Sequence, residues 1–449
     1  MKKNIIITLF IILALFLSSA VYSDESAENC FKAGIKLIAD GNYEGAITEL
    51  EKAVKLDPDN TEAQFQLGLA YYHNKSLNKA LTLFKKVLKV DPKNTPALNN
   101  TGMVYYRTKL YDEALEYFKK AVKIKPDYAL AHYNIGEVYA SQGKLKDAVG
   151  AWAKAVEFDP DDITYLNELG WGYHETGQYD KALEVLEKAL KIDPGNANVH
   201  INLGRSYHLT GRTGEAVLHW EKAIQINPGA AEAYNNLGGV YIKMGKLPEA
   251  EQMLKKAIEL DPLLAKPYNN LGLIFHRTDR KDESIAMYLK SMEVNPGYAD
   301  PYYNLANLYR ENENYDDSIA LYKKAIALNP YFVGAYNNMG IAYYMKQMDE
   351  EAIAAWEKVI ELQPDNMNPY NNIGKAYAAN KIYDKAIEYY KKALKLDPTS
   401  GMVYYNMALS YYKKKDHDKA VKYLDKAIEL GYEPSTITVE QIRKGKDEE

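Results

Sequence analysis

Asparagine recurs at one fixed interval along this chain. The sequence positions of nine asparagines differ by 34 or by a multiple of 34: Asn100, Asn134, Asn202, Asn236, Asn270, Asn304, Asn338, Asn372 and Asn406. Asparagine disfavours a helix by roughly 0.6 kcal/mol relative to alanine, so its recurrence indicates a role. A carboxamide carries hydrogen-bond donors and an acceptor, which match the N–H and C=O of a peptide group. The row therefore predicts binding of a peptide main chain with little regard for its sequence.

The other reactive side chains form no catalytic or metal-binding pattern. His174 and His208 are separated by the same interval, but Glu175 is the only further ligand near them, and a zinc site needs at least three protein ligands. His132 and His200 share a different phase and are interpreted as packed side chains. The sequence contains no Ser-His-Asp arrangement or phosphate-binding glycine loop that stands out. We predict a protein that is not an enzyme and that binds no cofactor and no metal.

The elements that carry these residues repeat with the same period. Successive prolines differ in position by 34 each time: Pro58, Pro92, Pro126, Pro160, Pro194, Pro228, Pro262, Pro296, Pro330, Pro364 and Pro398. Counting from them divides residues 27–434 into twelve equal units without an insertion, of which 27–60 is the first. We call each unit a repeat and number its places from the first residue, so that residue 27 is a first place. A fixed period of this length predicts a solenoid.

Each repeat predicts two helices. In the repeat 231–264, one apolar stripe at helical spacing comprises Tyr234, Leu237, Gly238 and Tyr241. A second stripe comprises Ala250, Leu254, Ala257 and Ile258. A turn at 245–247 separates them, and the proline ends the second helix because it lacks an N–H group. The small residues at the eighth and twentieth places allow the two helices to approach closely, where a larger side chain would cost about 1–3 kcal/mol.

This pattern resembles the tetratricopeptide repeat (TPR) family. The resemblance rests on the small eighth, aromatic eleventh and small twentieth places, the terminal proline, and bulky residues at the twenty-fourth place such as Phe84, Trp152, Trp220 and Trp356. It implies an all-α fold, a right-handed α-solenoid or superhelix of stacked antiparallel helix pairs, in which the first helix of each pair lines a concave groove. It also implies a scaffold that binds peptides or proteins. The asparagine row resembles the asparagine ladder in the superhelix of O-linked N-acetylglucosamine (O-GlcNAc) transferases.

The nine asparagines occupy the sixth place of their repeats. At about 100° per residue, the sixth place points about 200° away from the packed fourth place, which predicts that it faces the groove. Packed helices lie about 8–10 Å apart and an extended peptide rises about 3.3 Å per residue, so one repeat matches about three peptide residues. Two other interpretations stay open, in which the asparagines bridge to a neighbouring helix or are solvated groove residues.

Charged residues at groove-facing places predict an acidic stretch beside a basic one. The acidic residues are Glu137, Glu168 and Glu175. The basic residues, which follow along the chain, are Arg205, Lys243, Lys266 and Arg277, opposed mainly by Glu232. Such an order would favour a partner with the reverse order of charges. The alternative is ordinary solvated charge.

The N-terminus predicts export. Lys2 and Lys3 precede an apolar run from Ile5 to Leu17, and small residues follow, which is typical of a secretory signal peptide over residues 1–23. Cleavage would follow Ala20 or Ser23, and an uncleaved membrane anchor is the alternative. We therefore expect a periplasmic or extracellular protein, with the membrane contacted only through this segment if it is uncleaved.

Together these features predict an exported TPR scaffold that binds an extended peptide or a protein partner along its concave groove. A structural assembly factor of the cell envelope and an accessory subunit of a separate enzyme are the alternatives. Basic and acidic residues are balanced, 56 against 61, which argues against nucleic acid as a partner. The polar tail 435–449 is expected to form a short helix that caps the last repeat.

Overall fold

A computed structural model describes residues 26–447, and every regular element in that range is a helix. The predicted signal peptide, residues 1–23, lies outside the described residues. None of the helices in the described range is long and apolar enough to cross a membrane. The all-α prediction is confirmed, as is the solenoid of stacked helix pairs.

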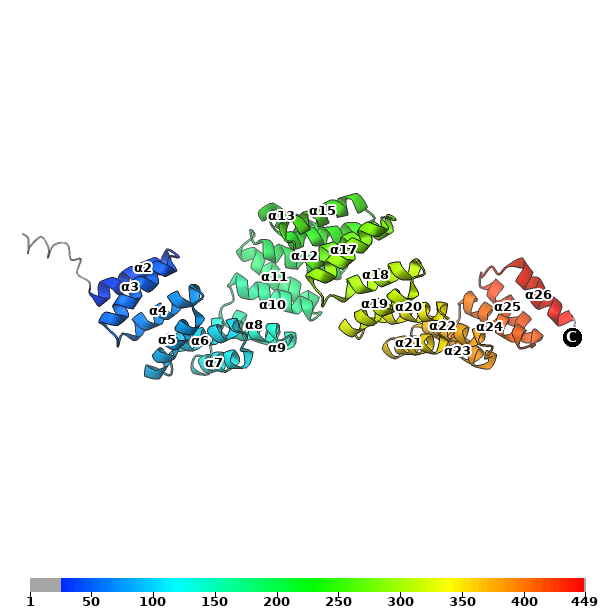
Figure 1. The fold of residues 1–449 in the computed structure, drawn as a ribbon, viewed down its shortest axis with the longest axis horizontal. Coiled ribbons are helices and arrows are strands. Elements are labelled where there is room, and N and C mark those ends of the chain that lie inside the picture. Colours follow the sequence, from blue (N-terminus) through cyan, green and yellow to red (C-terminus); the bar gives the residue numbers. More distant parts are fainter. Residues whose placement is uncertain (1–25, 448–449) are drawn as a thin grey trace, which may run out of the picture. The chain divides into compact units, whose positions relative to one another are not determined.

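The described chain forms two compact bodies, which meet in sequence between Pro228 and Gly229 (Figure 1). The N-terminal body comprises α2 (Ala27–Ala39), α3 (Tyr43–Leu56), α4 (Thr61–His73), α5 (Leu77–Val90), α6 (Thr95–Arg107), α7 (Tyr111–Ile124), α8 (Ala129–Ser141), α9 (Leu145–Phe158), α10 (Ile163–Glu175), α11 (Tyr179–Ile192), α12 (Ala197–Leu209) and α13 (Thr213–Ile226). The C-terminal body comprises α14 (Ala231–Lys243), α15 (Leu247–Leu260), α16 (Ala265–Arg277), α17 (Lys281–Val294), α18 (Ala299–Glu311), α19 (Tyr315–Leu328), α20 (Val333–Met345), α21 (Asp349–Leu362), α22 (Met367–Ala379), α23 (Tyr383–Leu396), α24 (Gly401–Lys413), α25 (His417–Glu429) and α26 (Thr436–Asp447).

The helix ends follow from local sequence. The side-chain oxygens of Asn60 and Asn94 accept the N–H groups of Ala63 and Ala97 at 2.9 Å, so they act as N-caps of first helices. Second helices end before the repeat proline. Asp91 there has the extended angles φ −125° and ψ 92°, because proline disfavours a helical conformation in the residue before it.

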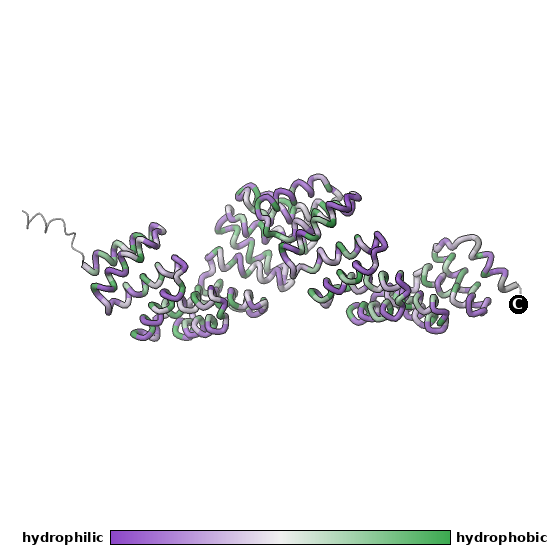
Figure 2. Tube along the Cα trace, viewed as in Figure 1, coloured by the Kyte–Doolittle hydropathy of each residue, from purple (hydrophilic) through white to green (hydrophobic). Residues whose placement is uncertain are grey.

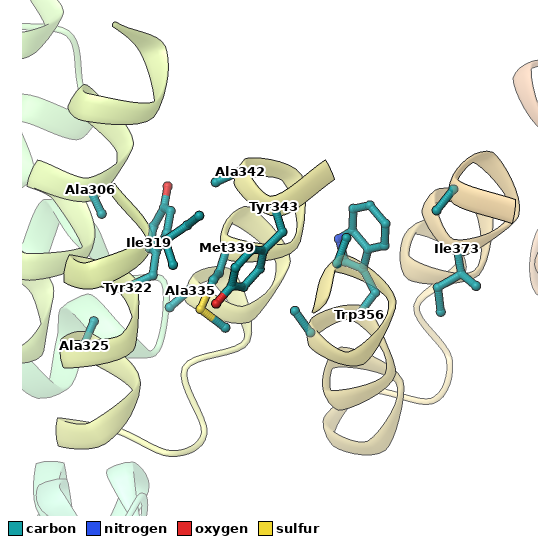
Figure 3. Packing of buried hydrophobic residues seen from close by; sticks show 13 residues of the cluster. Ala306, Ile319, Tyr322, Ala325, Ala335, Met339, Ala342, Tyr343, Trp356 and Ile373 are labelled. Carbon is teal, nitrogen blue, oxygen red and sulfur yellow. The ribbon is translucent and has the colours of Figure 1, made fainter. Parts of the chain in front are cut away.

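The two helices of a repeat pack where the sequence places a small residue. A Cβ atom on Gly136 would lie 2.4 Å from Trp152 Nε1, and one on Gly272 would lie 2.6 Å from the Tyr288 ring. These distances are too short for non-bonded atoms, so the eighth place must be small opposite a large twenty-fourth residue. Figure 3 shows one such pair in the C-terminal body, the eighth-place Ala306 and the twenty-fourth-place Tyr322.

The core runs along the stack instead of forming one centre. Each helix carries hydrophobic and hydrophilic positions in alternation, as the colours of Figure 2 show. Buried residues of successive repeats belong to one cluster, in which Met339 and Tyr343 of α20 lie between Tyr322 of α19 and Trp356 of α21 (Figure 3). Because first helices follow one another within each body, equivalent places on them form a row in that body.

The last helix, α26, packs against α24 and α25. Its Ile442 is fully buried within the cluster of the last repeats, and Arg443 forms an ion pair with Asp425 at 3.0 Å. The apolar face that the last repeat would otherwise expose is therefore covered in part by this helix.

Candidate functional site

The row of sixth-place asparagines lies on the first helices of the repeats. Most of these side chains are half-buried, and Asn134 is the most buried of them, at 4% exposure. The fifth-place asparagines beside them are more deeply placed, as Asn99 at 3% and Asn371 at 3% show. The fifth place therefore faces the neighbouring repeat, while the sixth place lies at the edge of the contact between the two repeats.

A hydrogen bond joins the sixth-place amide to the fifth-place side chain of the preceding repeat. Nδ2 donates to Oδ1 in five such pairs: Asn134 to Asn99 at 2.8 Å, Asn202 to Asn167 at 3.0 Å, Asn270 to Asn235 at 3.2 Å, Asn304 to Asn269 at 2.9 Å and Asn406 to Asn371 at 2.9 Å. Asn338 follows the same rule, because its Nδ2 donates to the fifth-place Tyr303 hydroxyl at 3.2 Å. It also donates to Asn307 Oδ1 at 2.9 Å.

The remaining three asparagines are held differently. Asn100 follows a repeat whose fifth place is Phe65, and its Nδ2 donates instead to the Pro96 carbonyl of its own helix at 2.9 Å. Asn236 accepts from Asn235 at 3.4 Å. Asn372 is half-buried. Asn100 and Asn236 follow apolar fifth-place residues, Phe65 and Ile201. Asn372 follows Asn337, whose Nδ2 donates to Asn338 Oδ1 at 3.0 Å.

These bonds change the chemistry expected of the row. The sequence left open whether the amides face a partner or bridge to a neighbouring helix, and the bridge is present at Asn134, Asn202, Asn270, Asn304, Asn338 and Asn406. A carboxamide has two N–H groups and an oxygen with two lone pairs. At the half-buried Asn202, Asn270, Asn304 and Asn406, one N–H is used between repeats, and one N–H and the oxygen remain in a fixed orientation. Asn338 uses both of its N–H groups, and Asn134 is buried.

Some fourth-place side chains form a hydrogen bond to the proline carbonyl of the preceding repeat, which was not predicted from the sequence. His132 Nε2 and His200 Nε2 bond the carbonyl oxygens of Pro126 and Pro194 at 2.8 and 3.2 Å. The hydroxyl of Tyr268 donates to the Pro262 carbonyl at 3.3 Å, in the equivalent position of the C-terminal body. Both histidines are buried, in line with the packed position expected of them. The sequence indicates this bond through the polar side chains that recur at the fourth place of an otherwise apolar stripe.

The predicted groove charges differ in the contacts that they make. Arg205 Nη2 and Glu175 Oε1 form an ion pair at 2.5 Å between successive repeats. Arg277 Nη1 donates to the carbonyl of Ile242 at 3.3 Å. Lys243 and Lys266 are exposed on the C-terminal body, as is Glu232. The predicted acidic and basic stretches therefore meet in an ion pair within the N-terminal body.

Glu137 and Glu168 remain as two half-buried carboxylates on successive first helices, α8 and α10. Burial and the charge of Glu168 raise the pKa of Glu137 to about 7. Burial also raises the pKa of Glu168, against a hydrogen bond from Asn167 Nδ2 at 3.2 Å. The two carboxylates occupy the same ninth and sixth places as Asn307 and Asn338, which are in direct contact.

The twelfth-place histidines do not converge. His174 Nδ1 bonds the Ser206 hydroxyl at 3.1 Å, while His276 Nε2 pairs with Glu311 Oε2 at 2.8 Å. Burial, followed by the nearby Arg205 charge, lowers the pKa of His174. Within residues 26–447, no group of three or more His, Cys, Asp or Glu side chains could hold a metal ion.

Known families match the chain over most of its length. A family described as TPR repeat matches residues 34–75, 110–143, 172–211, 204–245, 306–347 and 348–381. Families described as tetratricopeptide repeat match residues 61–94, 129–162, 229–296, 287–320, 368–400 and 402–430. No curated protein matches the chain significantly.

Two solved structures are similar. One is a chain of the APC/C hetero-tetramer Cut9–Hcn1, with 17% sequence identity, a TM-score of 0.50, and coverage of 96% of this chain and 98% of that chain. The other is YrrB, described as a TPR protein with an unusual peptide-binding site, with 25% identity, a TM-score of 0.36, and coverage of 41% of this chain and 95% of that chain. The first likeness supports the solenoid fold alone.

Proposed function

The chain belongs to the tetratricopeptide repeat family, and from this premise we propose that it is a scaffold that binds an extended segment of a partner protein along its sixth-place asparagines. TPR folds typically serve as non-catalytic protein-interaction scaffolds. The observation that carries the proposal is the bond between each of several sixth-place amides and the preceding repeat, exemplified by Asn304 Nδ2 to Asn269 Oδ1 at 2.9 Å.

Fixing an amide before binding lowers the entropy that association must lose. The amides of Asn202, Asn270, Asn304 and Asn406 each retain one N–H and the oxygen, and these can pair with a C=O and an N–H of a peptide main chain. Neighbouring first helices lie about 8–10 Å apart, so amides in successive repeats would meet every third residue of an extended guest. The contact would depend on the main chain more than on side chains.

The test uses a peptide selected from a random display library against residues 24–449. Methylation of peptide nitrogens, one position at a time, should weaken binding with a period of about three residues, while alanine substitution of most side chains has little effect. Calorimetric titration measures both series. A peptide that tolerates every N-methyl group but loses binding on alanine substitution would contradict the proposal.

A matched pair of variants separates the groove amide from the stability of the stack. Asn304→Ala and Asn269→Ala break the same hydrogen bond, but only Asn304 reaches the groove edge, because Asn269 is buried. We expect both to lower stability and only Asn304→Ala to weaken the peptide. If the protein is instead a cell-envelope assembly factor that uses other surfaces, both variants would retain partner assembly equally.

We also propose export, which rests on the sequence of residues 1–23. The mature protein would act in the periplasm or outside the cell. N-terminal sequencing of protein recovered from those fractions should begin at residue 21 or 24, whereas an intact Met1 in a membrane fraction would indicate an uncleaved anchor.

A further inference from the structure

We propose that Glu137 and Glu168 form a receptor for one cationic side chain of the partner, a lysine ammonium or an arginine guanidinium. This inference rests on the proposed function, because the cation is carried by the segment that lies along the groove. It assigns to the N-terminal body a point of side-chain selectivity within a row that otherwise contacts main chain.

The first argument is position. Glu168 replaces asparagine at the sixth place of its repeat, and Glu137 is at the ninth place of the preceding repeat. The same two places in the C-terminal body hold Asn338 and Asn307, whose side chains are in contact at 2.9 Å. The stack therefore directs these two places toward one another, and here it directs two carboxylates together.

The second argument is unbalanced charge. Among residues 26–447, neither Glu137 nor Glu168 takes part in an ion pair, whereas the nearby Glu175 is already neutralised by Arg205 at 2.5 Å. Two half-buried carboxylates without a cation repel each other, and burial adds to the cost of ionising them. A guest cation would remove both costs, and its bonds to carboxylate would be charge-assisted.

The third argument is a buried donor without an acceptor. Trp220 Nε1 and Trp356 Nε1 donate to the fifth-place carbonyls of Ile201 and Asn337 at 3.1 and 3.2 Å. Trp152 occupies the same twenty-fourth place and is fully buried, yet its Nε1 has no hydrogen-bond acceptor. This indole N–H lies beside the Glu137 carboxyl and lowers its pKa. A Glu137 held in its charged form by a guest cation would supply the acceptor that the indole lacks.

The surroundings favour an organic cation over a metal ion. Burial and the charges of Glu137 and Glu168 raise the pKa of Tyr133, and the Tyr133 ring stacks on that of Tyr165 with centroids 5.0 Å apart. The aliphatic stem of lysine or arginine can pack on such rings, and its charged head is attracted to their faces. Calcium prefers six to eight oxygen ligands, more than two carboxylates provide.

The experiment uses fluorine NMR of residues 24–449 labelled with 5-fluorotryptophan. The chain has four tryptophans, of which Trp152 and Trp171 are in contact near the site and Trp220 and Trp356 serve as internal references. The probes are two blocked pentapeptides, acetyl-Ala-Ala-Lys-Ala-Ala-amide and its glutamine counterpart. We expect the lysine peptide to shift Trp152 and Trp171 and to bind about tenfold more tightly than the glutamine peptide, with a loss of that preference at high salt.

The variants are Glu137→Gln and Glu168→Gln. Glu184→Gln, at an exposed position of α11, is a control with the same change in net charge. The first two should abolish the preference for lysine, and the control should retain it. Equal binding of both peptides, or no shift of the tryptophan resonances with either, would contradict the proposed cation receptor. Binding along the groove is tested separately by the N-methyl peptide series. Calcium chloride that shifts the same resonances at micromolar concentration and blocks the peptide would also overturn it, in favour of a metal site.

Discussion

The two bodies fill the same repeat frame with different polar residues. At the fourth place, the C-terminal body carries only tyrosine: Tyr234, Tyr268, Tyr302, Tyr336, Tyr370 and Tyr404. The N-terminal body carries Cys30, Gln64, Leu98, His132, Leu166 and His200 there. At the sixth place, the C-terminal body carries only asparagine, whereas the N-terminal body includes Lys32, Gln66 and Glu168.

This difference separates two roles of a repeat. Bonds such as Tyr268 to the Pro262 carbonyl at 3.3 Å hold one repeat on the next, and regular residues at these places give regular contacts. Where the residues depart from the pattern, the contact changes. Glu168 has the carboxylate of Glu137 near it at the place where Asn338 has the amide of Asn307. We therefore place the proposed selectivity for a partner where the row of asparagines is interrupted, at Glu168.

The largest loss of stability should follow removal of a large buried side chain at the twenty-fourth place. Trp356→Ala removes a side chain that is 2% exposed, and large-to-alanine changes of this kind cost about 3–5 kcal/mol. Urea denaturation of Trp356→Ala should show a C-terminal body that unfolds first. The loss of helical circular dichroism should then begin at a lower urea concentration than the fluorescence change of Trp152, Trp171 and Trp220, which all lie in the N-terminal body. Glu357→Ala, at an exposed neighbouring position, is the control and should leave the midpoint unchanged.

The inter-repeat amide bond should matter more where it is buried. Asn134→Ala leaves the buried oxygen of Asn99 without its donor and should cost about 1–2 kcal/mol, a value reduced by the better helix propensity of alanine. Asn304→Ala should cost less, because Asn304 is half-buried. Thermal unfolding of both variants compares the bodies, and an equal loss in both would mean that burial does not set the strength of the bond.

The acidic pair should make stability depend on pH in the N-terminal body. The groups facing Glu137 are Glu168 on α10, Trp152 on α9 and Tyr133 on α8. Its pKa is about 7 in the folded state and 4.5 as an ordinary value, so the folded state holds the proton more tightly. This contribution is therefore complete below about pH 4.5 and is lost as the pH rises through 7.

Glu137→Gln should accordingly raise stability at pH 8 and leave it unchanged at pH 4.5. After allowance for solvent screening of a half-buried group, the gain at pH 8 is about 1 kcal/mol. Chemical denaturation at the two pH values measures it. A variant whose advantage is equal at both pH values would show that the cost of ionising Glu137, through burial and the charge of Glu168, is not the cause.

The smallest effect concerns the turn between the two helices. Its fifteenth-place residue has a positive φ, and the N-terminal body supplies glycine there more often, as at Gly143 and Gly177, than the C-terminal body does, as at Gln347 and Lys381. Lys381 has φ 62°, a conformation that costs an L-residue about 1 kcal/mol. Lys381→Gly should therefore stabilise the C-terminal body by about 0.5–1 kcal/mol in thermal unfolding, whereas Gly177→Lys should destabilise its own body.

Much of the fold could be predicted because it is local. The repeat proline sets the end of the second helix through its missing N–H, and the small eighth place follows from the bulk opposite it, as Gly136 and Trp152 show. The site was less accessible to prediction. The helical wheel placed Asn304 toward the groove but could not identify Asn269 as the residue that takes its amide proton.

The period, the helix pairs, the family and the row of amides follow from residue types at fixed places, so they could be predicted from the sequence. The atoms that the amides bond, the ion pair of Glu175 with Arg205 and the absence of an acceptor for Trp152 Nε1 depend on how the helices stack. The physical reason is that residues about one repeat apart meet only through the stacking of helices.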